Sequence, residues 1–155
     1  MNETSALEPR RFAAVWERVN AGQAPNADSS ELLVQLIESA HVREMLYKSA
    51  SRSLPYFTKQ LKNLSSRENH AISALQTEYF LLTGDTYPLI RSETKQTPPL
   101  LALRSCFMSE NQSRCALESA SRRCDNRQSK LFSLLAKEAS ENADAVIGII
   151  SRILS

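Results

Sequence analysis

The 155-residue chain contains only three glycines, Gly22, Gly84 and Gly148, so it is poor in the residue on which tight hairpin turns depend. It has no apolar run near the roughly 20 residues that a membrane-spanning helix requires. Lysine and arginine total 19 against 17 acidic residues, and no block of like charge occurs. Charge therefore favours neither nucleic acid nor a membrane surface as a partner. These absences argue against an all-β fold and indicate a helical protein.

Cysteine is also scarce, and its spacing predicts no metal cluster. Cys106, Cys115 and Cys124 lie nine residues apart, which on a helix turns each by about half a circle from the last. There is no CxxC pair, so we expect reduced, structural thiols and a cytoplasmic protein. The first residues, MNET, lack the basic and apolar regions of a signal peptide, which agrees with that expectation.

The apolar residues that are present follow helical spacing. Residues 6–19 predict a short leading helix with Phe12 and Trp16 on one side, and the stretch with Gly22 and Pro25 predicts a linker. We therefore divide the chain into an N-terminal helix with linker, 1–27, and a helical domain, 28–155.

Four helices are expected in that domain, and their ends carry recognisable signals. The first three cover about 28–54, 56–82 and 98–124, and the fourth follows Asp125, a good N-cap residue. Pro55 separates the first two helices, and Gly84 has the position of a C-terminal stop. The connection over 85–98 is longer than antiparallel neighbours need. A four-helix bundle with one long crossover is the ferritin-like arrangement.

Polar residues interrupt the apolar stripes near the middle of each helix. Burying them without partners costs about 1–3 kcal/mol each, so they form either a satisfied polar layer, a solvated edge or a site. In di-iron bundles two helices each supply a Glu and the other two each supply a Glu-x-x-His. The polar residues on the predicted faces are His41, Glu44, Arg67, His70, Glu110, Arg114, Glu138 and Asn142.

Several segments of the chain together resemble the ferritin-like superfamily, specifically rubrerythrin-type domains of anaerobic bacteria. They are FAAVWERV, SSRENHAISALQTEYFLLTGDTY, SENQSRCALESAS and LFSLLAKEASENADAV, which together span most of residues 12–153. The resemblance implies a ferritin-like four-helix bundle preceded by a short helix, and in the family such a bundle holds two iron ions.

Carried over residue by residue, the resemblance retains few of the family's metal ligands. Arg67 replaces the Glu of the second helix's Glu-x-x-His while His70 keeps its His, and Glu110 matches the lone Glu of the third helix. Asn142 replaces the His of the fourth helix. In the first helix the ligand position falls on Ala40, and a shift of up to one turn in the alignment would place His41 or Glu44 there instead.

Three functions remain open at this point. The first is a ferritin-like bundle that has lost its di-iron centre, holds no cofactor and acts as a structural or interaction protein. Such a bundle could associate as a homodimer. The second is a metal-dependent oxidoreductase or ferroxidase that holds iron through His41, Glu44, His70 and Glu110. The third is a bundle that binds a small anion or other small molecule in the vacated cavity, near Arg67.

In the first function no metal balances the charge of the Glu110 carboxylate, so another cation must do so. We predict that the Arg67 guanidinium takes the place of the metal charge and pairs with Glu110, with Asn142 or His70 completing the hydrogen bonds.

Overall fold

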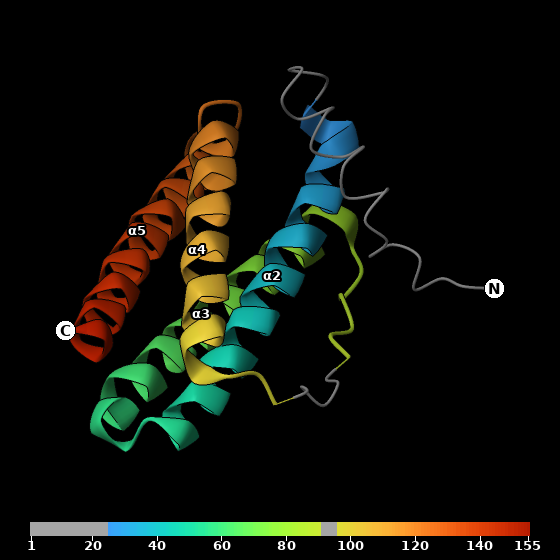
Figure 1. Ribbon diagram of the computed structural model, residues 1–155. Helices are drawn as coiled ribbons and strands as arrows, with labels where there is room; N and C mark the ends of the chain where they lie inside the picture. The colour runs from blue at the N-terminus through green and yellow to red at the C-terminus, as the bar shows by residue number, and fades with distance from the viewer. Residues whose placement is uncertain (1–24, 91–95) are drawn as a thin grey trace.

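The computed structural model describes residues 25–90 and 96–155, which form four long helices and one short 3-10 helix (Figure 1). The described helices are α2 (Pro25–Ser53), η2 (Pro55–Phe57), α3 (Thr58–Thr83), α4 (Pro99–Ser121) and α5 (Asn126–Leu154). These residues include no strand, so the prediction of an all-α fold is confirmed. The leading helix predicted over 6–19 lies outside the described residues.

The helix ends follow from local chemistry, largely as the sequence predicts. Gly84 ends α3 with φ of 81°, a left-handed conformation that favours glycine, and its N–H donates to Phe80 O at 2.8 Å. The Asp125 side chain accepts the N–H of Gln128 at 3.0 Å and so caps α5. α2 begins at Pro25, a few residues ahead of the start expected near residue 28.

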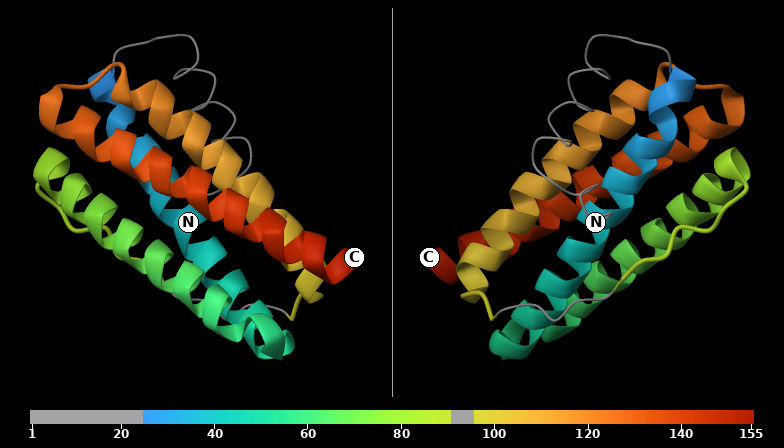
Figure 2. Two further views of the ribbon diagram at one scale, coloured as in Figure 1. Left: turned by 90° about the vertical axis from the view of Figure 1, so that its left-hand side faces the viewer. Right: turned by 90° about the vertical axis from the view of Figure 1, so that its right-hand side faces the viewer.

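The four helices form two antiparallel hairpins that pack against each other. α2 pairs with α3 and α4 pairs with α5, and α2 also lies against α4 (Figures 1 and 2). α3 ends at the opposite end of the bundle from the start of α4, so the connection between them returns along the bundle's length. Its described first part is fixed by Tyr87, whose hydroxyl donates to Glu38 and whose ring packs edge-on against Tyr79.

The apolar core is divided into two clusters. One contains Leu33 and Ile37 of α2 with Leu75, Leu117 and Phe132, and is the cluster beside the α4–α5 turn. The other is built around Tyr47, Leu61, Leu64, Leu103, Cys106, Val146 and Ile149. Each of the four long helices contributes to both clusters, and the stretch of helix between its two contributions carries buried polar residues. The bundle thus has a polar layer across its middle.

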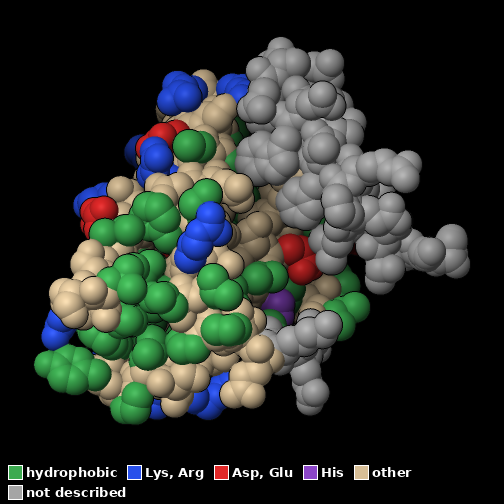
Figure 3. Space-filling view, in the orientation of Figure 1, with side chains coloured by type: hydrophobic (Ala, Val, Ile, Leu, Met, Phe, Trp, Pro, Cys, Tyr) green, Lys and Arg blue, Asp and Glu red, His purple; other side chains and the backbone are tan. Residues whose placement is uncertain are grey.

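Some apolar side chains remain on the surface. Hydrophobic groups gather over the lower parts of α4 and α5 in Figure 3, and α4 exposes Leu101 and Met108. In the part of the chain that the structure describes, no helix combines the length and apolar character needed to cross a membrane.

Candidate functional site

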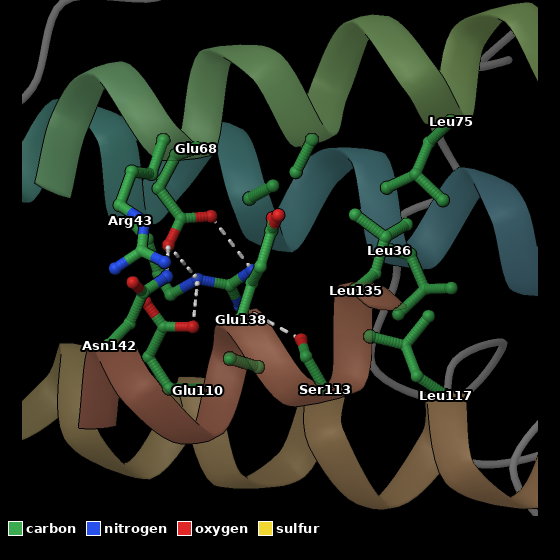
Figure 4. Close-up of a pocket in the computed structure, with 14 residues that line it drawn as sticks. Leu36, Arg43, Glu68, Leu75, Glu110, Ser113, Leu117, Leu135, Glu138 and Asn142 are labelled. Atoms are coloured by element: carbon green, nitrogen blue, oxygen red, sulfur yellow. Dashed lines mark hydrogen bonds and ion pairs between the residues drawn. The ribbon is translucent and has the colours of Figure 1, made fainter. Parts of the chain in front are cut away.

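The polar layer is centred on Arg43 of α2, which is 5% exposed. Its guanidinium reaches α3, where Nε donates to Glu68 Oε2 and Nη2 donates to Glu68 Oε1, both at 3.1 Å (Figure 4). Two parallel hydrogen bonds between a planar guanidinium and a carboxylate are stronger and more specific in geometry than hydrogen bonds between neutral groups. Arg43 therefore joins α2 to α3 at the middle of the bundle.

The same guanidinium also binds α4. Nη1 donates to Ser109 Oγ at 2.8 Å and to Ser113 Oγ at 2.9 Å, and Nε lies 3.5 Å from Glu110 Oε1. Each of the three guanidinium nitrogens thus has an oxygen partner. A buried cation is tolerated when its charge is balanced and its N–H groups find acceptors, and here Glu68 balances the charge while Glu68, Ser109 and Ser113 accept hydrogen bonds.

Glu110 is held in place by Tyr47, which belongs to the core cluster that contains Leu61 and Val146. The Tyr47 hydroxyl donates to Glu110 Oε2 at 2.7 Å, and both side chains are buried. From α5, Asn142 Nδ2 donates to Glu68 Oε2 at 3.4 Å. All four helices therefore contribute a side chain to one connected polar network.

The network contains more acidic groups than cations, and protonation restores the balance. Burial raises the pKa of Glu110 to about 9. Glu68 also raises this pKa, whereas the positive charge of Arg43 lowers it. Burial also raises the pKa of Tyr47. Burial alone would lower the pKa of Arg43, but the attraction of Glu68 and Glu110 outweighs it and the pKa is raised. With these pKa values, Arg43 is charged and Glu110 carries its proton at neutral pH.

The predicted pair between Arg67 and Glu110 is wrong. Arg67 Nη2 donates to Glu141 Oε1 of α5 at 2.8 Å, with side chains that are 32% and 47% exposed. The reason is the register of α3, which turns Glu68 to the interior and leaves Arg67 at the rim. The principle of an internal arginine holds, but the residue that provides it is Arg43.

The residues proposed as metal ligands do not come together. His70 is exposed on α3, whereas Glu110 is buried in the network. His41 Nδ1 lies 3.5 Å from Glu44 Oε1 on α2, but Glu44 Oε2 is also 3.1 Å from the ammonium group of Lys48. Among the described residues, no group of three or more His, Cys, Asp or Glu could hold a metal ion.

The remaining polar residues of the predicted faces are peripheral or local. Arg114 donates to Glu118 of its own helix at 3.2 Å rather than to Glu110. Glu138 is half-buried and points toward the small cavity beside the network (Figure 4).

That cavity is too small to be a ligand site. It measures about 30 Å³ and is lined by Arg43, Glu68, Glu110 and Asn142 together with apolar side chains, with Arg67 and Glu138 also on its wall. Pockets for small molecules are typically about 300–1,000 Å³, whereas a cavity needs only about 10–15 Å³ to hold a water. Glu110 Oε1 and Asn142 Oδ1 are buried without a hydrogen-bond partner, so the cavity suits a water rather than the small anion considered above.

Two central residues were missed by the sequence analysis, Arg43 and Glu68. A signal for Arg43 exists, because it lies three residues after Ala40 and four before Tyr47 and so shares their helix face. Glu68 lies four residues after Leu64 and Arg67 lies three residues after it. Both spacings keep a residue on the same helix face as Leu64, so the sequence pattern allows either one to be buried.

Comparison of the chain with protein-family models, with curated proteins and with solved structures finds no match. Any function must therefore be argued from the chemistry of the site. The fold and the network define an all-α protein of four long helices, over its described residues, with a buried ionic layer.

Proposed function

We propose that this chain is a ferritin-like bundle in which Arg43 takes the place of a di-iron centre, and that its role is structural or interactive rather than catalytic. The observation that carries the proposal is the guanidinium of Arg43 between Glu68 and Glu110 at the middle of the bundle. The order of two helical hairpins joined by one long connection supports the ferritin-like part.

The donor set at the centre does not fit two iron ions. Such a site uses about four carboxylates and two imidazoles from the four helices. Here the buried donors are the carboxyl groups of Glu68 and Glu110, the Tyr47 hydroxyl and the Asn142 amide. The fixed positive charge of Arg43 among them repels a second cation, so no reaction step is assigned to a metal.

An interaction role is supported by the surface of α4. Leu101 is 56% exposed and Met108 is 46% exposed, and Figure 3 shows hydrophobic groups gathered on the face that α4 and α5 form. Contiguous exposed apolar groups are typical of surfaces that bind another macromolecule.

Metal analysis tests the proposal directly. Protein purified without chelators is expected to contain far less than one metal ion per chain, and its melting temperature is expected to stay constant on adding EDTA, because no metal stabilises the native state. The Glu110→Gln variant is a matched control, since it removes a carboxylate that any central metal would use. About two iron or manganese ions per chain, lost in that variant, would overturn the proposal.

A further inference from the structure

A second hollow lies between α2 and α3, apart from the central network. It measures about 460 Å³ and is formed by the last turns of α2 and the first half of α3. Its wall contains three cations, Lys48, Arg52 and Lys62, and otherwise only Ser and Asn side chains. Neither a carboxylate nor an apolar side chain lines it, in contrast to the central cavity.

The three cations differ in how far they are already neutralised. Lys48 Nζ lies 3.1 Å from Glu44 Oε2, so part of its charge is balanced by a buried carboxylate. Arg52 and Lys62 are both exposed, and neither forms an ion pair with any of the described residues. Arg52 is on α2 and Lys62 is on α3, so the two free charges face the hollow from opposite walls.

The neutral residues of the hollow supply hydrogen-bond donors. The hydroxyls of Ser51 and Ser65 donate to backbone carbonyls, at 2.7 Å and 3.4 Å, and are therefore already used. Ser66 and Asn69 line the same hollow and form no hydrogen bond with other described side chains. A hydroxyl and an amide N–H₂ group are suitable donors to the oxygens of an anion.

We propose that this hollow between α2 and α3 binds the phosphate group of a small soluble molecule. Arg52 offers the planar set of N–H groups that matches two phosphate oxygens, and Lys62 supplies a mobile point charge opposite it. Ser66 and Asn69 donate to the remaining oxygens. No aliphatic or aromatic residue lines the hollow, which favours a soluble phosphate over a lipid, whose binding would also need contact with acyl chains.

This site is separate from the proposed replacement of the di-iron centre. The hollow shares no lining residue with the central cavity, so either idea can fail without the other.

A titration with pyrophosphate followed by two-dimensional amide NMR tests the site. We expect saturable shifts of the Asn69 side-chain amide signals, with a dissociation constant at or below about 1 mM. Arg52→Ala and Lys62→Ala are each expected to weaken binding by about tenfold, because each removes a charge-assisted contact. Raised sodium chloride should weaken binding in the wild type as well.

Lys59→Ala is the matched control, because Lys59 is an exposed lysine at the start of α3 that does not line the hollow. Its affinity for pyrophosphate is expected to stay within about twofold of wild type. Equal weakening in Lys59→Ala and Lys62→Ala would mean general charge attraction and would overturn the proposal. So would the lack of saturation by about 10 mM pyrophosphate, or binding to vesicles of phosphatidic acid without binding to pyrophosphate.

Discussion

Arg43 and Arg67 line the same small cavity, but Arg43 is buried and Arg67 lies at the solvent-exposed edge of the bundle. The side chain of Arg43 is 6% exposed and is bound by oxygens from α3 and α4, whereas that of Arg67 is 32% exposed and has one partner, Glu141, which is 47% exposed. Water and salt screen the outer pair, and they do not reach the inner one to the same degree.

The comparison separates two uses of charge in one bundle. At the rim, an ion pair forms or breaks with little change in free energy, because water replaces either partner. At the centre, each group was removed from water on folding, so the loss of one partner leaves the other unmatched. The inner network therefore fixes how the two helical hairpins meet, and the outer pair adds little to that choice.

Removing the central cation is expected to have the largest effect. Arg43→Met leaves Glu68 buried without its guanidinium, and breaking a buried ion pair in this way costs about 3–5 kcal/mol. Urea denaturation at neutral pH measures the change. Arg104→Met, a substitution of an exposed arginine on α4, is the control and should change the free energy of unfolding by less than about 0.5 kcal/mol.

A double variant tests whether the loss of stability in Arg43→Met comes from leaving the Glu68 carboxylate buried without a partner. Arg43→Met combined with Glu68→Met removes both charges, and a buried pair can often be replaced by apolar groups without net loss. The double variant should thus recover much of the lost stability. If Arg43→Met lost less than about 1 kcal/mol, or if the double variant were no better than the single one, the central pair would not have the role described.

Glu110→Gln is expected to have the next largest effect, and one that depends on pH. Burial raises the pKa of Glu110 to about 9, whereas a glutamate in an unfolded chain has a pKa of about 4.3. Between these values the folded state binds one proton more than the unfolded state, so the stability due to this group is complete at low pH and is lost as pH rises through the folded pKa. The slope cannot exceed about 1.4 kcal/mol per pH unit.

The measurement is the free energy of unfolding from about pH 5 to about pH 8 for both proteins. Glutamine resembles the protonated carboxyl group but has no proton to lose in this range, so the variant should gain on the wild type as pH rises. Taking the difference between the two proteins cancels the titration of every other group. Parallel curves would show that Glu110 is ionised in the folded protein and that the centre is not neutral.

Much of the fold could be predicted from residues that act locally, within a few positions along the chain. Gly84 and Asp125 end and begin helices for reasons of local conformation and hydrogen bonding, and these positions were predicted correctly. The long connection was equally visible, because Pro88 and Pro98 prevent a continuous helix there. The ferritin-like resemblance itself stays a prediction.

The site was harder to predict because it depends on the register of α3. After Leu64, both a three-residue step to Arg67 and a four-residue step to Glu68 fit a helical stripe. Burial of Glu68 becomes favourable only through Arg43, which is 25 residues away and on another helix. Local periodicity contains no information on such a pairing, so the sequence indicated an internal arginine but assigned it to the wrong position.

Breaking the rim pair is expected to have the smallest effect and completes the comparison. Arg67→Ala should reduce the free energy of unfolding by less than about 1 kcal/mol, because both Arg67 and Glu141 regain water when the pair is lost. A double-mutant cycle with Glu141→Ala isolates the coupling between the two side chains, which should lie near about 0.2–1 kcal/mol and decline with added salt. A coupling above about 2 kcal/mol, insensitive to salt, would place Arg67 in the same class as Arg43 and would remove the distinction between rim and centre.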